Sequence, residues 1–504
     1  MLDVLVVGGG PVGLLLGGEL HLGGARTLVL EASDGAERRT RSLGQRAISP
    51  RSAQTLALRG LVPALEAAQN SWAAHLAAAG QETRDGDQLA RVLELMRKGR
   101  AKGHFAGMPL ESDGTDGGRT YLMKQHMLEQ LLSDWAAGLG VQVEPNSQVV
   151  AVRDEGTCVV ADLADGRSLR AGYLVGCDGG RSTVRKSAGF AFPGTAATMT
   201  GRVAVAELAE PHKPTAVLRG PGGLVNGLMV PGEITTVEFD GTGPTDRDAP
   251  MTPAELAGSM LRAGGLAVTV ARLEAGTRFS DNTRQADTYR RGRVLLAGDA
   301  AHVHSPIGGQ GLNLGLQDAA NLGWKLALVA TGRAPERLLD TYTAERHPVG
   351  ARVLRNTRAQ LVLMRPGPHV DALREVLAET LTIPAAHEYF GALVSGADVD
   401  YAPDTAQPLV GRFLPDELWS AVAEHMSDGR FLLLNPGDDE RLREAVDGND
   451  RVRVVHLLAP GTGMAALLVR PDGYVAWAGT DPGPAGLSEA LDRWCGQPAV
   501  RTEG

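Results

Sequence analysis

The glycine-rich segment at residues 8–13, Gly-Gly-Gly-Pro-Val-Gly, constrains the fold more than any other part of the chain. It follows an apolar run at residues 3–7, expected to be a strand, and opens a segment expected to be helical, Pro11–Leu22. A second apolar strand is expected over Thr27–Leu30. Strand, helix and strand in this order form a βαβ unit, whose strands lie parallel in one sheet. The chain is therefore predicted to begin with an α/β domain of the Rossmann type.

Three glycines of this segment have separate roles in such a turn. Gly8 permits the tight turn, Gly10 lets the backbone approach a pyrophosphate, and Gly13 lets the helix pack on the strand. Glu31 ends the second strand, where it can accept hydrogen bonds from both hydroxyls of an adenosine ribose. The glycine pattern alone is weak evidence, but strand, helix and acid together favour a site for FAD or NAD over a plain glycine turn.

Two later motifs also follow apolar strands. Residues 177–185 come after a strand at 173–176, and taken alone they favour a tight turn in which Asp178 caps the next helix. Residues 296–302 place Asp299 at a strand end, where a carboxylate can hold a ribitol hydroxyl. The glycine run that follows opens a helix, so unpaired backbone N–H groups face a ligand there.

The second half of the chain contains two further patterns. An antiparallel sheet is expected between residues 190 and 275, with strands at 202–206, 215–218, 227–230 and 235–239. The helix after residue 310 has apolar residues at steps of three and four, which predicts one apolar face and an end at Gly332. Beyond residue 400 the order strand, helix, strand, hairpin, helix is thioredoxin-like, without a CxxC motif. We therefore expect packing or dimerisation from this part, and no redox role.

Charge and cysteine content exclude several partners. The net charge of -9 over 504 residues argues against nucleic acid or an anionic membrane as a principal partner. The uncharged run at residues 4–18 is shorter than the roughly 20 residues of a membrane span, and no basic leader precedes the first strand. A cytoplasmic protein is expected. Cys158, Cys177 and Cys495 lie far apart, which predicts no metal site and no dithiol relay.

The three motifs resemble, in order and spacing, those of the group A flavoprotein monooxygenases, typified by p-hydroxybenzoate hydroxylase. The resemblance covers nearly the whole chain and is greatest for the aromatic-polyketide hydroxylases and the rifampicin monooxygenases. Its most specific part is the run from residue 298 to 313, continued through Gln317-Asp318 to Trp324-Lys325. A later Tyr342-x-x-Glu345-Arg346 also matches.

The resemblance implies roles at the matching positions. Arg41 would touch the flavin side of FAD, Gln125 would lie near the ribitol and phosphate, and Asp299 would bind the ribitol. The chemistry would be carried by the flavin, so no catalytic side chain is assigned, and His302 and His304 are interpreted as capping or supporting groups. The FAD-binding residues implied are Gly8, Gly10, Pro11, Val12, Gly13, Glu31, Arg41, Gln125, Asp178, Asp299, Pro306, Gly309, Gly311, Leu312 and Asn313.

The same resemblance implies a domain division. Residues 1–175 would form the FAD-binding domain, with an excursion at 70–119 over the substrate site. Residues 176–275 would form a mixed-sheet substrate domain, and 276–400 the second part of the FAD-binding domain with linker helices. Residues 401–504 would form the thioredoxin-like domain, for which a homodimer contact is one option.

The implied reaction uses NADPH or NADH and O2 to hydroxylate an aromatic, polyketide-type substrate through a C4a-hydroperoxyflavin. Baeyer–Villiger or epoxidation chemistry with the same oxidant stays open, because the substrate pose decides between them. A flavin-containing polyketide-binding protein without turnover is the alternative from another class. A halogenase is disfavoured, since none of the tryptophans stands in a Trp-x-Trp-x-Ile-Pro segment.

Overall fold

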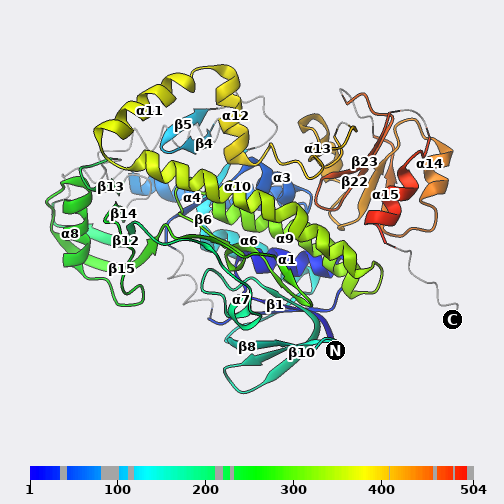
Figure 1. Ribbon diagram of the computed structural model, residues 1–504, viewed down its shortest axis with the longest axis horizontal. Helices are drawn as coiled ribbons and strands as arrows, with labels where there is room; N and C mark the ends of the chain where they lie inside the picture. Colours follow the sequence, from blue (N-terminus) through cyan, green and yellow to red (C-terminus); the bar gives the residue numbers. More distant parts are fainter. Residues whose placement is uncertain are drawn as a thin grey trace.

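The computed structural model describes residues 1–34, 43–80, 101–111, 119–210, 219–227, 232–407, 409–457, 462–480 and 483–496. Figure 1 shows a central α/β body crossed by two long helices, with an antiparallel sheet on one side and a smaller C-terminal body on the other. The fold is thus the predicted α/β class: a Rossmann-type domain, a sheet domain and a thioredoxin-like domain.

The central sheet is built on the predicted βαβ unit. Its parallel strands stand in the order β18, β10, β1, β2, β7. Strand β9 pairs antiparallel with β10, and β8 pairs antiparallel with β9. Because these parallel strands all end at one edge, the glycine loop and the two later motifs meet there. The elements are β1 (Leu2–Val7), α1 (Pro11–Leu22), β2 (Thr27–Leu30), β7 (Gln142–Glu144), β8 (Val149–Asp154), β9 (Val159–Leu163), β10 (Ser168–Gly176), α7 (Thr183–Ser187), β17 (Arg290–Arg291) and β18 (Val294–Leu296).

Helices α1, α6 (Gln125–Leu139) and α9 (Gln310–Ala330) pack together beside this sheet. The sequence predicted one apolar face for α9, but the helix is buried on all sides from Leu314 to Val329. Its second face buries polar side chains. Asp318 and Lys325 bind residues in the first turns of α10 (Asp340–Met364), and Asn321 donates to Asp472 of the C-terminal domain. Helix α3 (Pro50–Ala57) begins as predicted, with the Ser49 side chain accepting from the Ser52 N–H.

The antiparallel sheet has the strand order β13, β14, β12, β15, and α8 packs on one face. Strands β12 and β14 were predicted, whereas β13 and β15 were not. The predicted strand at 215–218 and residues 228–230 of the one predicted at 227–230 fall outside the described residues. The elements are β12 (Thr200–Leu208), β13 (Gly223–Asn226), β14 (Glu233–Glu238), α8 (Pro253–Gly264) and β15 (Val270–Ser280).

Glu255 joins α8 to this sheet. Its carboxylate accepts hydrogen bonds from Arg202 Nε at 2.8 Å and from Arg278 Nε at 2.8 Å. The hydrogen bond from Arg278 is the main reason why the pKa of Glu255 is lowered from 4.5 to about 2. A carboxyl group with a depressed folded-state pKa stabilises the fold above its unfolded pKa and loses this contribution as the pH falls toward the folded value.

We therefore expect Glu255→Gln to lower the free energy of unfolding by about 1–3 kcal/mol at pH 7, after allowing for the partial exposure of the group. The difference from the unchanged protein should shrink steadily between pH 4.5 and pH 2, because the unfolded chain then takes up a proton that the folded chain resists. Urea unfolding of both proteins at several pH values measures this difference in the free energy of unfolding. A difference that stays constant down to pH 3 would contradict the assignment.

A layer of helices covers the space between the two sheets. Helix α10 crosses the molecule, and α11 and α12 fold back over a β4–β5 hairpin (Figure 1). The predicted excursion at 70–119 contains regular structure, since α4 continues to Gly80 and β4 and β5 form a hairpin. The remaining elements here are α4 (Val62–Gly80), β4 (Ala101–Phe105), β5 (Met108–Glu111), α10 (Asp340–Met364), α11 (Pro368–Thr380) and α12 (Pro384–Ser395), with short pieces β3 (Gln45–Ile48), β6 (Tyr121–Lys124), β11 (Gly194–Thr195), β16 (Thr283–Gln285), η1 (Gly298–Ala300), β19 (His302–Val303) and η2 (Glu336–Leu339).

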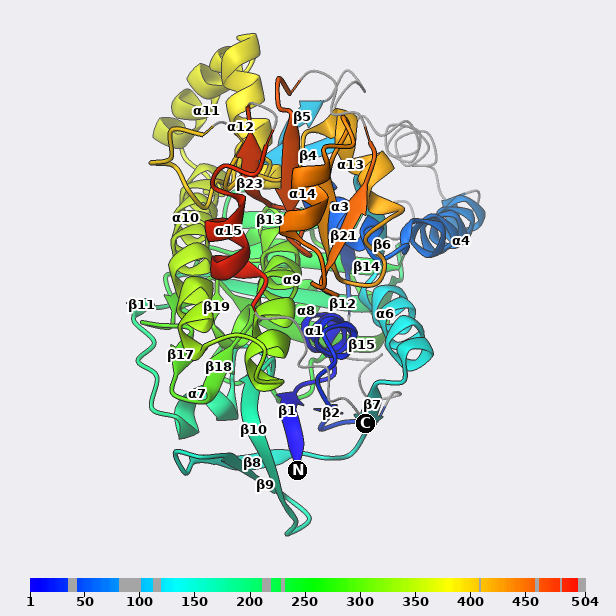
Figure 2. The same cartoon turned by 90° about the vertical axis from the view of Figure 1, so that its right-hand side faces the viewer.

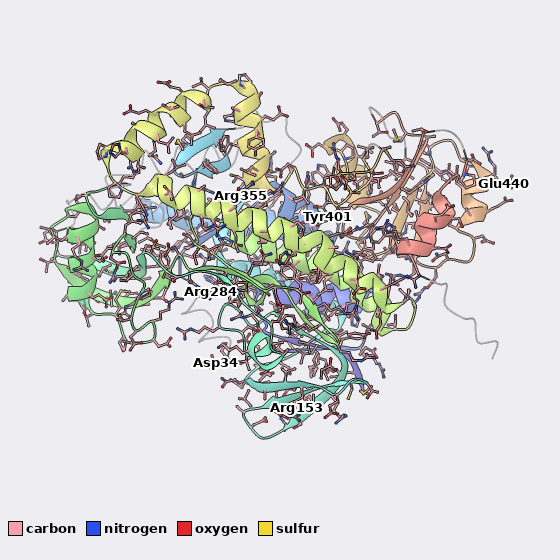
Figure 3. All side chains as sticks on the ribbon, in the orientation of Figure 1. Asp34, Arg153, Arg284, Arg355, Tyr401 and Glu440 are labelled. Atoms are coloured by element: carbon pink, nitrogen blue, oxygen red, sulfur yellow. The ribbon has the colours of Figure 1, made fainter. Side chains whose placement is uncertain are left out.

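The C-terminal domain has the predicted thioredoxin-like order. Strand β20 pairs parallel with β21 and antiparallel with β22, which forms a hairpin with β23. Figure 2 shows this domain seated over the α1 and α9 helices. Its elements are α13 (Asp416–Ala423), β20 (Phe431–Leu434), α14 (Glu440–Ala445), β21 (Val452–Val455), β22 (Ala466–Val469), β23 (Val475–Gly479) and α15 (Leu487–Trp494).

A buried charge cluster fastens this domain to the central body. Arg470 donates to both oxygens of Glu345, at 2.7 and 2.9 Å, and also to Asp472. Lys325 of α9 donates to Glu345 at 2.7 Å, and burial lowers the pKa of Lys325 to about 8. All four side chains are nearly inaccessible to solvent. The Tyr-x-x-Glu-Arg motif on α10 thus contributes to the domain contact.

None of the helices within the described residues combines the length and the apolar character needed to cross a membrane.

Candidate active site

An open cavity of about 1150 Å³ lies at the carboxyl edge of the parallel sheet. Backbone and side chains from all three motifs line it, together with the β3 strand and the start of α6. Nine of the fifteen predicted FAD-binding residues are on its wall, and these are Gly10, Pro11, Val12, Gln125, Asp299, Pro306, Gly309, Gly311 and Leu312.

The three glycines of the first loop occupy different environments. A Cβ on Gly13 would lie 1.9 Å from the Gly8 carbonyl oxygen, and one on Gly8 would lie 2.3 Å from the Cys177 oxygen. At these two positions the protein backbone leaves no space for a side chain. A Cβ on Gly10 would meet nothing within 4 Å. Gly10 therefore leaves open space on the cavity side, as a backbone that approaches a ligand must.

Glu31 does not line the cavity but supports the glycine loop. Its Oε2 accepts from the Gly9 N–H at 2.8 Å, and its Oε1 accepts from the backbone and side chain of Ser33. The carboxylate is thus fixed beside the turn, at the end of β2. This position fits the predicted contact with a ribose.

Arg46 is a cavity residue that the sequence interpretation missed. Strands β3 and β6 pair antiparallel, which brings Arg46 next to Gln125, and Arg46 Nε donates to Gln125 Oε1 at 2.9 Å. Burial lowers the pKa of Arg46, and the negative charge of Asp299 opposes this effect. Arg41, the predicted flavin-side arginine, lies outside the described residues. The overlooked signal was the short strand ahead of the Ser49-Pro50 helix start.

The second motif braces the third. Asp178 Oδ2 accepts from the Val184 N–H at 3.0 Å, the helix-capping role that the sequence favoured for this motif alone. Arg185 donates to the Ala300 carbonyl at 2.9 Å and stacks on Phe192. Only Gly179 and Cys177 of this motif reach the cavity wall.

Helix α9 points its N-terminus into the cavity. Gly309 precedes it in the left-handed conformation and gives no side-chain cap, so the first N–H groups of the helix face the cavity without an internal partner. The Asn313 side chain is held by protein groups, donating to the Ala47 carbonyl and accepting from the Ser49 N–H. An uncapped helix start of this kind favours a negatively charged ligand group.

The two histidines of the third motif differ in environment. His302 is fully buried and pairs with Asp318 at 2.6 Å, and Asp318 also accepts from Arg346 Nε. Burial alone would raise the pKa of Asp318, but His302 and Arg346 outweigh it and hold this pKa below its usual value. His304 lines the cavity, burial lowers its pKa, and its Nδ1 donates to the Ser305 carbonyl.

The residues fit a flavin dinucleotide. A glycine cradle, an exposed carboxylate at Asp299 and an uncapped helix start face one cavity, so pyrophosphate, polyol and an electron-accepting ring each have a matching group. No group of three or more His, Cys, Asp or Glu side chains arranged for a metal is found in the part of the chain that the structure describes. The fold and the site define a single-Rossmann dinucleotide-binding protein.

Comparison with known proteins identifies the family. The FAD binding domain family matches residues 1–357, and the aromatic-ring hydroxylase C-terminal family matches residues 407–498. Rifampicin monooxygenase of Streptomyces venezuelae is 39% identical, over 95% of this chain and 96% of that protein. The solved structure of an anhydrotetracycline hydroxylase from Streptomyces rimosus has a TM-score of 0.80 at 35% identity, covering 99% and 100% of the two chains. The chain belongs to the FAD-dependent aromatic-ring hydroxylases, which are monooxygenases that use FAD with NAD(P)H as reductant.

Another relative carries a different name. Dialkyldecalin synthase of Streptomyces rugosporus is 33% identical, over 98% of this chain and 99% of that protein. Its name gives a dialkyldecalin as the product and mentions no oxygenation. The same fold therefore accompanies two kinds of named chemistry among the relatives.

Proposed function

We propose that this protein hydroxylates a polycyclic aromatic substrate of the polyketide type, and that the described cavity holds its FAD. When bound, FAD supplies electron transfer from NAD(P)H to O2. Asp299 holds the ribitol, and Arg46 and Gln125 bind the cofactor from the β3 side. The start of α9 stabilises negative charge on the cofactor, because its N–H groups and dipole point at it.

The observation that supports the substrate class is the pair of apolar clusters behind the loop that precedes α9. Pro306 and Gly309 of this loop line the FAD cavity, whereas Ile307 packs into two apolar clusters that border each other. Apolar side chains beside the loop that borders the FAD cavity suit a large aromatic ring system. Members of these two clusters include Met199, Leu224, Val237, Phe239, Phe279, Leu361, Phe105, Met108, Leu363 and Phe390.

The test is NADPH and NADH oxidation by the FAD-loaded protein with anhydrotetracycline, rifampicin and simpler polycyclic phenols. We expect at least one of these aromatics to raise the oxidation rate several-fold and to gain one oxygen atom by mass spectrometry. Rapid consumption that yields only hydrogen peroxide with every compound would contradict aromatic hydroxylation by this protein.

A ring-forming synthase is the second candidate, favoured by the likeness to dialkyldecalin synthase. The same assay separates the two, since a synthase would convert a polyene substrate into a product of unchanged mass without consuming NADPH. A product with oxygen inserted beside a carbonyl would instead indicate the Baeyer–Villiger outcome. The cytoplasmic location, the homodimer and the domain boundaries stay predictions.

A further inference from the structure

The side-chain amide of Gln360 is buried, and only its oxygen has a hydrogen-bond partner among the described residues. It lies on α10, with none of its surface exposed, and its Oε1 accepts from the Ala106 N–H at 3.0 Å. This bond fixes the orientation of the amide, because a backbone N–H can only donate. The Nε2 group consequently points away from Ala106, and it has no hydrogen-bond partner among the described residues.

The spare donor lies against the loop that borders the FAD cavity. A Cβ added to Gly308 would be 2.9 Å from both Gln360 Nε2 and Gln360 Oε1, so the amide rests directly on this glycine. Gly308 adopts φ +89°, and Gly309, the next residue, is on the cavity wall. The amide therefore lies against Gly308, whose neighbours along the chain are the cavity residue Gly309 and Ile307, which packs into the apolar clusters.

A buried hydrogen-bond donor without a partner destabilises the protein when its surroundings are apolar. Most buried N–H groups in folded proteins are paired, and an unpaired one loses its hydration without return. Ile307, the residue before Gly308, packs into a cluster of apolar side chains that includes Phe239, Phe279 and Leu361. None of these can accept the hydrogen bond of the amide.

We infer that Gln360 Nε2 donates a hydrogen bond to a carbonyl, phenol or phenolate oxygen of the aromatic substrate and so selects its orientation. The inference rests on the proposed function for the place and class of that substrate. A single amide donor in an apolar wall binds a flat ring system in the pose that brings an oxygen to it. Gln360 is a specificity-determining residue in this arrangement, and the reaction itself requires no proton from it.

Gln360 has a second role that the experiment must separate from the first. Ala106 has φ +51° at the turn of the β4–β5 hairpin, and this turn is clamped from two sides. Gln360 holds its N–H, and Arg374 Nη1 donates to its carbonyl at 2.7 Å. Removing either side chain loosens the hairpin, but only Gln360 carries the spare donor. Arg374→Met is therefore the matched control for Gln360→Met.

The experiment compares 1-naphthol with naphthalene, two ring systems that differ by one oxygen. Dissociation constants are measured on the FAD-loaded protein from the change in flavin absorbance. We expect the unchanged protein and Arg374→Met to bind 1-naphthol about five- to tenfold more tightly than naphthalene, as one buried hydrogen bond provides. For Gln360→Met the ratio should fall to about one. Because the ratio is taken within each variant, a general loss of stability or affinity does not alter it.

The inference is overturned if Gln360→Met keeps the preference, if the unchanged protein shows none, or if neither compound binds. In the first case the amide serves the hairpin alone. An equal loss in Arg374→Met would assign the preference to the hairpin position and also overturn it. Failure of the proposed function is recognised separately, as oxygen-selective binding in a protein whose NADPH oxidation no aromatic compound stimulates.

Discussion

Replacing Arg470 by methionine is expected to lower the free energy of unfolding by about 3–5 kcal/mol. Arg470 makes bidentate hydrogen bonds to Glu345 and further bonds to Asp472, with 2% of its side chain exposed. Without it, two buried carboxylates face one cation, Lys325. A buried charge that loses its partner costs far more than an exposed pair contributes. Chemical unfolding of the two proteins side by side gives the difference.

Two further variants separate charge from packing. Arg412→Met removes an exposed arginine of this domain from its pair with Asp400 and should cost less than about 1 kcal/mol. Adding Asp472→Asn to Arg470→Met leaves Glu345 opposite Lys325 alone, so the charges balance again and part of the stability should return. If the double variant is no more stable than Arg470→Met, lost packing and not unpaired charge would explain the effect.

This cluster also marks the limit of what the sequence could predict. The helical pattern of α9 correctly gave its start, its end and an apolar face. The same pattern cannot show that Lys325 and Asp318, on the other face, are buried, because their partners come from residues far along the chain. Glu345 and Arg346 were noticed only as a matching motif. Their pairing with Arg470 and Asp318 depends on tertiary packing, which the motif does not show.

In the candidate site, too, residues placed by local secondary structure could be predicted, and residues placed by long-range contacts could not. Positions fixed by local geometry were predicted well, since a glycine loop after a strand and an acid at a strand end place Gly10 and Asp299 by secondary structure alone. Arg46 was missed because its place depends on the pairing of β3 with β6, two strands separated by about 75 residues of chain. Gln360 carried no signal in the sequence, since a glutamine on a long helix is ordinarily solvated.

Replacing Gly10 by alanine is expected to weaken FAD binding by at least about 100-fold, close to 3 kcal/mol, while leaving the stability of the flavin-free protein unchanged. The backbone of Gly10 has φ -74° and ψ -178°, which alanine adopts without strain. An added Cβ would meet no protein atom within 4 Å, so the change affects only what occupies the cavity. The pyrophosphate must approach this backbone closely, and a methyl group prevents it.

Two neighbouring substitutions make the result specific to the ligand. Gly138→Ala places a methyl group in equally open space on α6, away from the cavity, and should leave both flavin binding and stability intact. Gly13→Ala should destabilise the protein even without flavin, because its Cβ would lie 1.9 Å from the Gly8 oxygen. Flavin titration followed by fluorescence quenching, with thermal unfolding of the flavin-free proteins, separates the three. If Gly10→Ala binds FAD as tightly as the unchanged protein, the pyrophosphate does not lie against this turn, and the cavity holds the cofactor elsewhere or not at all.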